Sequence, residues 1–172
     1  MHTMSAADAV DLLRCLEAHD VPVCLGGGWA VDALLGEQTR EHSDLDLWAP
    51  AARLEGLFAG LAEAGVDRVY PWPGDRPWNF VLHDGARRRV DLHLYEPRPD
   101  GDLHYGSALD GVGFPAAALA GRGRIAGTEV RCEAPEWSLR WHTGYPPRPT
   151  DHHDMSRLRR RFNLPLPEDF SD

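Results

Sequence analysis

The sequence between residues 23 and 47 decides the fold. It reads Val23-Cys24-Leu25-Gly26-Gly27-Gly28-Trp29-Ala30-Val31-Asp32-Ala33-Leu34-Leu35-Gly36 and continues, after seven residues, as Asp44-Leu45-Asp46-Leu47. The apolar run 23–25 predicts a short strand, the glycines predict a turn, and residues 29–35 predict a helix that Gly36 ends. Residues 44–49 alternate polar and apolar side chains, which predicts a second strand. The local order is therefore strand, glycine turn, helix and strand.

Three aspartates in this part of the chain form one candidate site. Asp44 and Asp46 are two positions apart on a strand, so both side chains point to the same side, about 6.7 Å apart. Asp91 lies between apolar residues in a further predicted strand, where an ionised carboxylate needs a partner. Two carboxylates about 4 Å apart repel by about 4 kcal/mol, unless a metal neutralises them. Oxygen ligands of this kind favour magnesium, and two ions are expected here.

The glycines and two basic residues predict a phosphate-binding element. Gly27 and Gly28 precede a helix, and a turn without side chains lets backbone amides approach phosphates at the positive end of the helix. Arg40 is expected to neutralise a β or γ phosphate through paired hydrogen bonds, and His42 is a second candidate for that contact. Taken singly, the glycines are equally well explained as a tight turn, and an Asp-x-Asp pair at a strand end is more often solvated than a metal site. The combination is much more specific than its parts.

The remaining elements are predicted from periodicity and capping signals. Helices are expected over residues 5–19, 50–64, 135–144 and 150–162, the last capped by Thr150, and strands over residues 67–70, 79–83 and 89–95, with a hairpin over 123–132. Residues 96–114 are rich in Pro, Gly and Asp, which predicts a long irregular connection.

Composition limits the classes of function. The chain has 172 residues, a formal charge of −9 and 42% apolar residues, which is typical of one folded domain. All 18 basic residues are arginine, and the acidic balance disfavours a general binder of nucleic acid or anionic membranes, whereas a cationic small substrate suits it. The three cysteines show no metal or disulfide spacing. Without a signal-peptide pattern or a long apolar run, the sequence predicts a cytoplasmic protein with no membrane partner.

The motifs together resemble a known superfamily. The run from Gly27 to Gly36, then Gln38-Thr39-Arg40-Glu41-His42 and Asp44-Leu45-Asp46-Leu47, is similar to the signature of polymerase-β-type nucleotidyltransferases, within them the lincosamide nucleotidyltransferases and aminoglycoside 2''-nucleotidyltransferases. Val90-Asp91-Leu92-His93 falls where the family carries its third aspartate, the general base. His142-Thr143-Gly144-Tyr145 and Thr150-Asp151-His152-His153-Asp154 resemble the C-terminal segment of the lincosamide type.

The resemblance implies both a fold and a reaction. The fold is α+β, a mixed β-sheet flanked by helices, with a nucleotidyltransferase domain over residues 1–133 and a C-terminal helical segment over residues 134–172 packed on it. The implied reaction uses magnesium held by Asp44, Asp46 and Asp91, and moves a nucleoside monophosphate, AMP from ATP or its counterpart from another triphosphate, to a hydroxyl of a small antibiotic. Asp91 takes the proton of that hydroxyl. A homodimer is also expected from the family.

The acceptor is the least specified part of this reading. Glu96, Asp100, Asp102 and Asp110 predict either an acidic loop that attracts an aminated sugar or a solvated loop. Trp72, Trp78, Tyr95 and Tyr105 predict either aromatic walls for a sugar or a cationic ring or, as is more frequent in such a domain, parts of the core. The acidic residues of 151–154 fit the first turn of a helix better than a zinc site, and the arginines of 157–161 fit a solvated helix end.

Two alternatives remain open at this stage. One is a nucleotidyltransferase that acts on a protein or RNA target, as antitoxin-like members of the superfamily do, although the −9 charge disfavours RNA. The other is a nucleotide-binding module without turnover. The sequence specifies neither the acceptor hydroxyl nor the preferred base.

Overall fold

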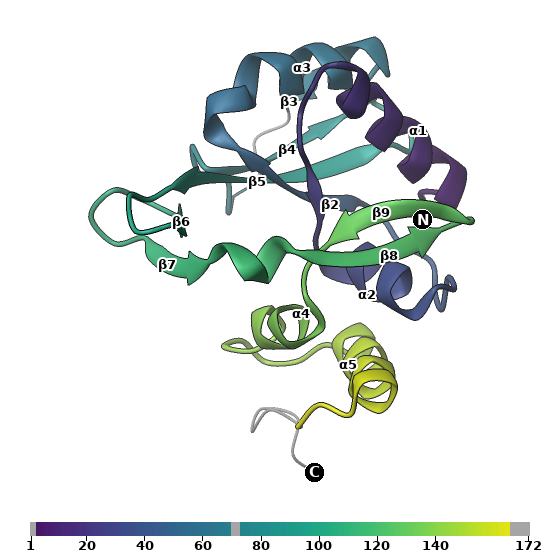
Figure 1. The fold of residues 1–172 in the computed structure, drawn as a ribbon. Helices are drawn as coiled ribbons and strands as arrows, with labels where there is room; N and C mark the ends of the chain where they lie inside the picture. The colour runs from purple at the N-terminus through teal and green to yellow at the C-terminus, as the bar shows by residue number, and fades with distance from the viewer. Residues whose placement is uncertain (1–2, 70–72, 166–172) are drawn as a thin grey trace.

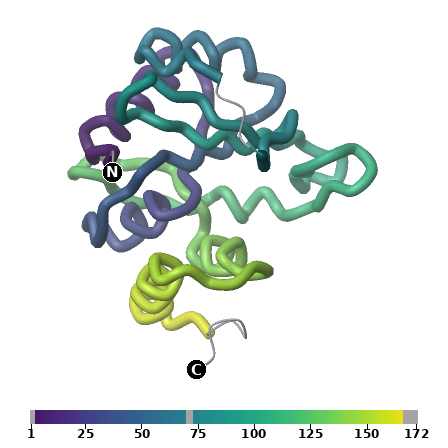
Figure 2. The backbone as a smooth tube through the Cα atoms, turned by 180° about the vertical axis from the view of Figure 1, so that it is seen from behind, coloured from purple at the N-terminus to yellow at the C-terminus, as the bar shows by residue number. Residues whose placement is uncertain are grey.

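The computed structural model describes residues 3–69 and 73–165 (Figures 1 and 2). A mixed nine-stranded sheet forms its centre, as the family resemblance implied. Seven of its strands follow one another in the order β3-β4-β5-β2-β1-β9-β8, and the other two lie off this path, beside β5. Strand β2 is parallel to β5, and β1 is parallel to β9, whereas the other neighbours along this path are antiparallel. The bounds are β1 Cys24–Leu25, β2 Leu45–Pro50, β3 Arg68–Val69, β4 Asn79–His83, β5 Arg89–Pro97, β8 Gly121–Ile125 and β9 Thr128–Cys132.

Helices cover the sheet in two groups. Helices α1 (Ala6–Ala18) and α3 (Leu54–Glu63) lie together, whereas α4 (Pro135–Trp141) and α5 (Pro149–Phe162) stack on α2 (Gly27–Leu35), away from α1 and α3 (Figure 1). Ser5 and Asp8 form the predicted capping box at the start of α1. Because α2 lies between the central core and the C-terminal helices, it connects both parts of the molecule.

Three apolar clusters hold these layers together. The largest joins α1, α2 and α3 to the middle strands, where Leu47 and Leu92 are fully buried. A second cluster surrounds Trp48 and Phe114. The third packs Val31 of α2 against the C-terminal helices through Leu139, Met155 and Leu158. The C-terminal helices therefore share a core with α2, while the predicted domain boundary at residue 133 stays a prediction.

The irregular connection predicted for residues 96–114 is wrong. Residues Asp102–Tyr105 form β6 and residues Val112–Pro115 form β7, and this hairpin pairs with the second half of β5 and projects to one side (Figures 1 and 2). Each strand is four residues long, too short for a clear period, and most of the Pro, Gly and Asp residues lie in the turns. Leu103 and Phe114 are buried and anchor the hairpin.

Several element ends also differ from the prediction. Strand β2 begins at Leu45, after Asp44, and Pro50 leads into a 3-10 turn at Ala51–Arg53 before α3. The last helix has Arg148 rather than Thr150 as its N-cap. Helix α2 begins at Gly27, and α4 ends at Trp141. Strand β8 begins at Gly121, and β3 covers Arg68–Val69, with Tyr70 outside the described residues.

Helices long and apolar enough to cross a membrane are absent from the described part of the chain.

The central strand β5 offers a test of the core. Leu92 is 0% exposed, so Leu92→Ala leaves a cavity and is expected to lower the free energy of unfolding by about 2–5 kcal/mol in urea titrations followed by circular dichroism. Val69→Ala is the control, because Val69 is 61% exposed and its loss should cost less than about 0.5 kcal/mol. Equal losses for the two variants would contradict this description of the core.

Candidate active site

Strands β2 and β5 place two of the predicted aspartates side by side. Asp46 on β2 is the register partner of Asp91 on β5, so the two side chains leave neighbouring parallel strands on the same face of the sheet. Both line a cavity of about 510 Å³. The structure brings all seven predicted site residues to this cavity: Gly27, Gly28, Arg40, His42, Asp44, Asp46 and Asp91.

A histidine that the sequence reading did not select completes the closest group of potential ligands. His93 follows Asp91 by two positions on β5, and its Nε2 lies 3.7 Å from Oδ1 of Asp46 and 3.9 Å from Oδ1 of Asp91. One ligand atom from each of these three residues lies within 4.8 Å of the others. Asp44 lines the same cavity but does not belong to this triplet. The period-two pattern that placed Asp91 was the signal that could have identified His93.

The electrostatics of the group show the effect of crowding. Burial raises the pKa of Asp91 to about 6, and the charges of Asp46 and Asp44 add to that rise. Burial and the charge of Asp46 also raise the pKa of Asp44. Burial acts in the same direction on Asp46, but the neighbouring His93 outweighs it and holds the pKa of Asp46 below its usual value. The carboxylates therefore repel one another, and a cation would stabilise them.

The glycine turn is required by close packing against these carboxylates. Gly27 has φ +55°, a left-handed conformation that favours glycine, and a Cβ at this position would collide with the carboxylate of Asp46. A Cβ on Gly28 would collide with Nη2 of Arg40. The backbone N–H of Gly26 donates to the carbonyl of Asp46 at 2.9 Å, which ties the turn to β2. The start of α2 therefore lies directly beside the aspartates.

Arg40 is held at this cavity by the C-terminal helix. Its Nε and Nη2 donate to the carboxylate of Asp154 on α5 at 2.9 Å and 2.7 Å, and its Nη1 donates to the carbonyl of Glu41 at 3.0 Å. Asp154 is 1% exposed. Of the five N–H groups of a guanidinium, one on each terminal nitrogen stays without a partner among the described residues. Asp154 therefore positions Arg40. The predicted interaction of the acidic residues with the helix dipole does not by itself account for this contact.

His42 is fixed in the same region by α2. Its Nε2 lies 2.5 Å from Oδ2 of Asp32, and its ring packs on Trp29 with centroids 4.3 Å apart. Oδ1 of Asp32 also accepts hydrogen bonds from the N–H and hydroxyl of Thr39, at 3.0 Å and 2.6 Å. Asp32 therefore orders the loop that carries both predicted phosphate contacts.

The acidic and aromatic residues expected to bind the acceptor lie elsewhere. Glu96 lies in β5, Asp102 in β6, and Asp100 and Asp110 in the turns before and after β6, and none of the four lines the cavity. Trp78 packs against the main core, Tyr95 and Tyr105 pack against the cluster around Trp48, and Trp72 lies outside the described residues. The cavity wall includes Trp48, Trp141 and Tyr145 instead.

Glu133, which follows β9, is a further buried acid at this wall. It is 3% exposed, and its Oε1 accepts a hydrogen bond from Nε1 of Trp48 at 2.7 Å. Burial raises the pKa of Glu133 to about 7. No local pattern in the sequence marks this residue, because its contact with Trp48 spans 85 positions.

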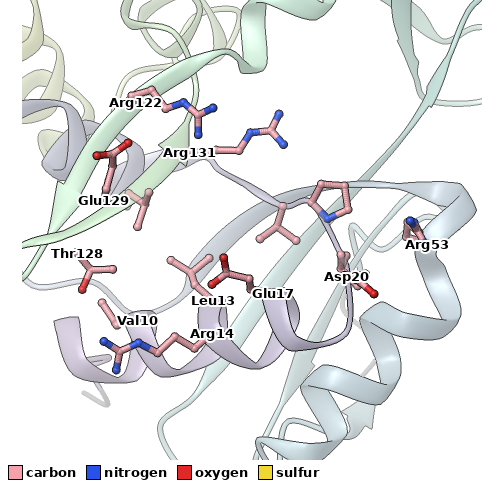
Figure 3. Close-up of a pocket in the computed structure, with 14 residues that line it drawn as sticks. Val10, Leu13, Arg14, Glu17, Asp20, Arg53, Arg122, Thr128, Glu129 and Arg131 are labelled. Atoms are coloured by element: carbon pink, nitrogen blue, oxygen red, sulfur yellow. The ribbon is translucent and has the colours of Figure 1, made fainter.

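A second cavity, of about 600 Å³, lies between α1 and the β8–β9 hairpin (Figure 3). Its lining includes Leu13, Glu17, Arg122 and Arg131, and none of the seven predicted site residues. The chemistry predicted from the sequence therefore belongs to the cavity beside β2 and β5.

The Arg40–Asp154 ion pair predicts a measurable cost. In Arg40→Gln the buried carboxylate of Asp154 loses its cation, so we expect the free energy of unfolding to fall by about 3 kcal/mol. Arg40→Gln/Asp154→Asn should recover part of that loss, as measured in urea titrations. Arg157→Gln is the control, because the Arg157–Glu37 pair is exposed and 3.8 Å long and should contribute less than about 1 kcal/mol. A double variant no more stable than Arg40→Gln would contradict this account.

Comparisons with known proteins identify the family of the chain. The family model described as aminoglycoside-2''-adenylyltransferase matches residues 9–158. A 2''-aminoglycoside nucleotidyltransferase from Escherichia coli is 32% identical over 153 residues, which cover 86% of this chain and 81% of that protein. A lincosamide resistance protein from Staphylococcus haemolyticus is 26% identical over 148 residues, which cover 86% and 90%.

The fold is shared with a solved structure as well. The crystal structure of the lincosamide antibiotic adenylyltransferase LnuA, lincomycin-bound, superposes with a TM-score of 0.79 at 24% identity, covering 91% of this chain and 98% of that one. The fold predicted from the sequence resemblance is thereby confirmed. With a family model that spans most of its length, the chain belongs to the aminoglycoside-2''-adenylyltransferase family and is a nucleotidyltransferase.

Proposed function

We propose that the chain is a magnesium-dependent enzyme that transfers a nucleoside monophosphate, AMP from ATP, to a hydroxyl of a small cationic antibiotic of the aminoglycoside or lincosamide class. The observation that carries this proposal is the register of Asp46 with Asp91, beside a glycine turn that opens on the same cavity. The match to the adenylyltransferase family supports the type of reaction.

The donor set of the cavity fits magnesium. Asp44, Asp46 and Asp91 offer carboxylate oxygens, which are the ligands that magnesium prefers. Burial and the charge of Asp46 raise the pKa values of Asp44 and Asp91, and a bound cation would offset both effects. We therefore assign the metal to these three residues. When bound, magnesium neutralises phosphate oxygens and stabilises the leaving pyrophosphate.

Other groups of the chain bind the phosphates and accept the proton. The backbone N–H groups of Gly27 and Gly28 approach phosphates at the start of α2, and the two unpartnered N–H groups of Arg40 bind phosphate oxygens. Asp91 accepts the proton of the acceptor hydroxyl. The hydroxyl oxygen then forms a bond to the α-phosphorus, while the bond from that phosphorus to the pyrophosphate oxygen breaks.

The cavity favours a cationic acceptor. Asp44, Asp46, Asp91 and Glu133 line it, while its two arginines, Arg40 and Arg148, already pair with Asp154 and Asp151. Trp48, Trp141 and Tyr145 supply aromatic faces that suit an ammonium group or a sugar ring.

Mass spectrometry tests the reaction directly. The protein, magnesium and each nucleoside triphosphate are incubated with aminoglycosides and lincosamides, and we expect a gain of one AMP unit on one class with ATP. Asp91→Asn is the control and should lose the gain. Nucleotide binding without any modified acceptor would contradict the proposal and direct the search toward protein targets or a module without turnover.

Metal binding has a separate readout in the absence of acceptor. A ligand that binds only the folded state stabilises it, so magnesium at ten times its Kd should raise the Tm by about 3–6 °C at pH 7. Asp46→Asn/Asp91→Asn lacks two of the three assigned ligands and should show a much smaller rise in differential scanning fluorimetry. An equal rise in both proteins would place the metal elsewhere.

A further inference from the structure

We propose that Asn79 is a positioning residue for the reaction: its side-chain amide holds Oδ1 of Asp91 and leaves Oδ2 of that carboxylate to the cavity. This inference rests on the proposed function, in which Asp91 accepts the proton of the acceptor hydroxyl. Asn79 lies on β4, beside the catalytic strand, and does not line the cavity itself.

The sheet brings the amide to the carboxylate. Strand β4 pairs antiparallel with β5, and Asn79 stands opposite His93, one diagonal step from Asp91. Nδ2 of Asn79 donates to Oδ1 of Asp91 at 2.7 Å and to the carbonyl of Leu92 at 3.1 Å. One amino group therefore binds both the side chain of Asp91 and the backbone next to it.

The surroundings fix which end of the amide faces Asp91. Two acceptors lie within hydrogen-bond distance of Nδ2, namely Oδ1 of Asp91 and the carbonyl of Leu92. A flipped amide would place its oxygen against these acceptors and lose both hydrogen bonds. Donation from Asn79 to Asp91 is therefore the arrangement that satisfies the site.

Holding one oxygen determines what the other can do. Oδ2 of Asp91 has no hydrogen-bond partner among the described residues and is not enclosed by them. A carboxylate turns easily about its last side-chain torsion, which would exchange its two oxygens. The bond from Asn79 suppresses that rotation, so that one oxygen stays directed at the reacting hydroxyl.

A neutral donor is the suitable partner at this position. Asp91 already lies beside the carboxylate of Asp46, its register partner on β2. The amide of Asn79 holds Oδ1 of Asp91 at 2.7 Å without adding a charge to this group. Arginine or lysine at this place would instead neutralise the charge that holds the metal.

Kinetics of two variants test the role. Asn79→Leu keeps the approximate shape without the donor, and Asn79→Ala serves if the leucine variant does not fold. With the acceptor found by mass spectrometry, we expect kcat to fall about 10- to 100-fold, as is typical of residues that orient a ligand or base, while KM for ATP stays within about twofold. A structural residue would not separate kcat from KM in this way.

The control variant lies on the same strand. Val81→Ala removes packing directly opposite Asp91 but leaves the hydrogen bond of Asn79, so its kcat should stay within about twofold of wild type at a comparable loss of Tm. If the Asn79 variants keep their kcat, or if Val81→Ala loses as much kcat as they do, the positioning role of Asn79 is wrong while the proposed function stands. A wild-type chain that transfers nothing overturns the proposed function, and the role of Asn79 with it.

Discussion

The parallel pairing of β2 with β5 is the constraint on which the site depends. It forces Asp46 and Asp91 into neighbouring positions, although like charges about 4 Å apart repel by about 4 kcal/mol at an effective dielectric near 20. The opposite faces of the same two strands carry Leu45, Leu47 and Leu92, all fully buried. Because a shift of one residue would expose these leucines, burial fixes the register and outweighs the repulsion at the site.

The second constraint is the contact of the C-terminal helix with α2 and with the loop that follows α2. Arg40 and Asp154 are 114 positions apart, yet their ion pair sets where a guanidinium stands beside Gly28. The third apolar cluster packs α5 on α2 through Val31 and Met155. The C-terminal helices therefore form part of the site, and a description limited to the sheet would omit the group that orients Arg40.

Local patterns predicted most of the site because its main residues lie on short, regular stretches. The glycine turn, the Asp44–Asp46 spacing and the strand of Asp91 each follow from fewer than ten residues, and the structure places all of them at one cavity. Asn79, Glu133 and Asp154 escaped prediction because their roles arise only from strand pairing or helix packing. The β6–β7 hairpin escaped for another reason: its strands are held by two buried anchors rather than by a repeated pattern.

The charge balance of the cavity extends the proposed function to the choice of acceptor. Its arginines pair with acids of the C-terminal helix, so Asp44, Asp46 and Asp91 are offset only in part, by His93 beside Asp46 and Asp91 and by the charge of Arg89 near Asp44. A nucleoside triphosphate adds further negative charge. Under the proposed function, magnesium and a cationic acceptor would supply further compensating charge. An acceptor with ammonium groups lowers the electrostatic energy of the ternary complex, whereas a neutral or acidic acceptor does not. The excess of acidic side chains at the cavity thus supports the proposed preference for cationic molecules.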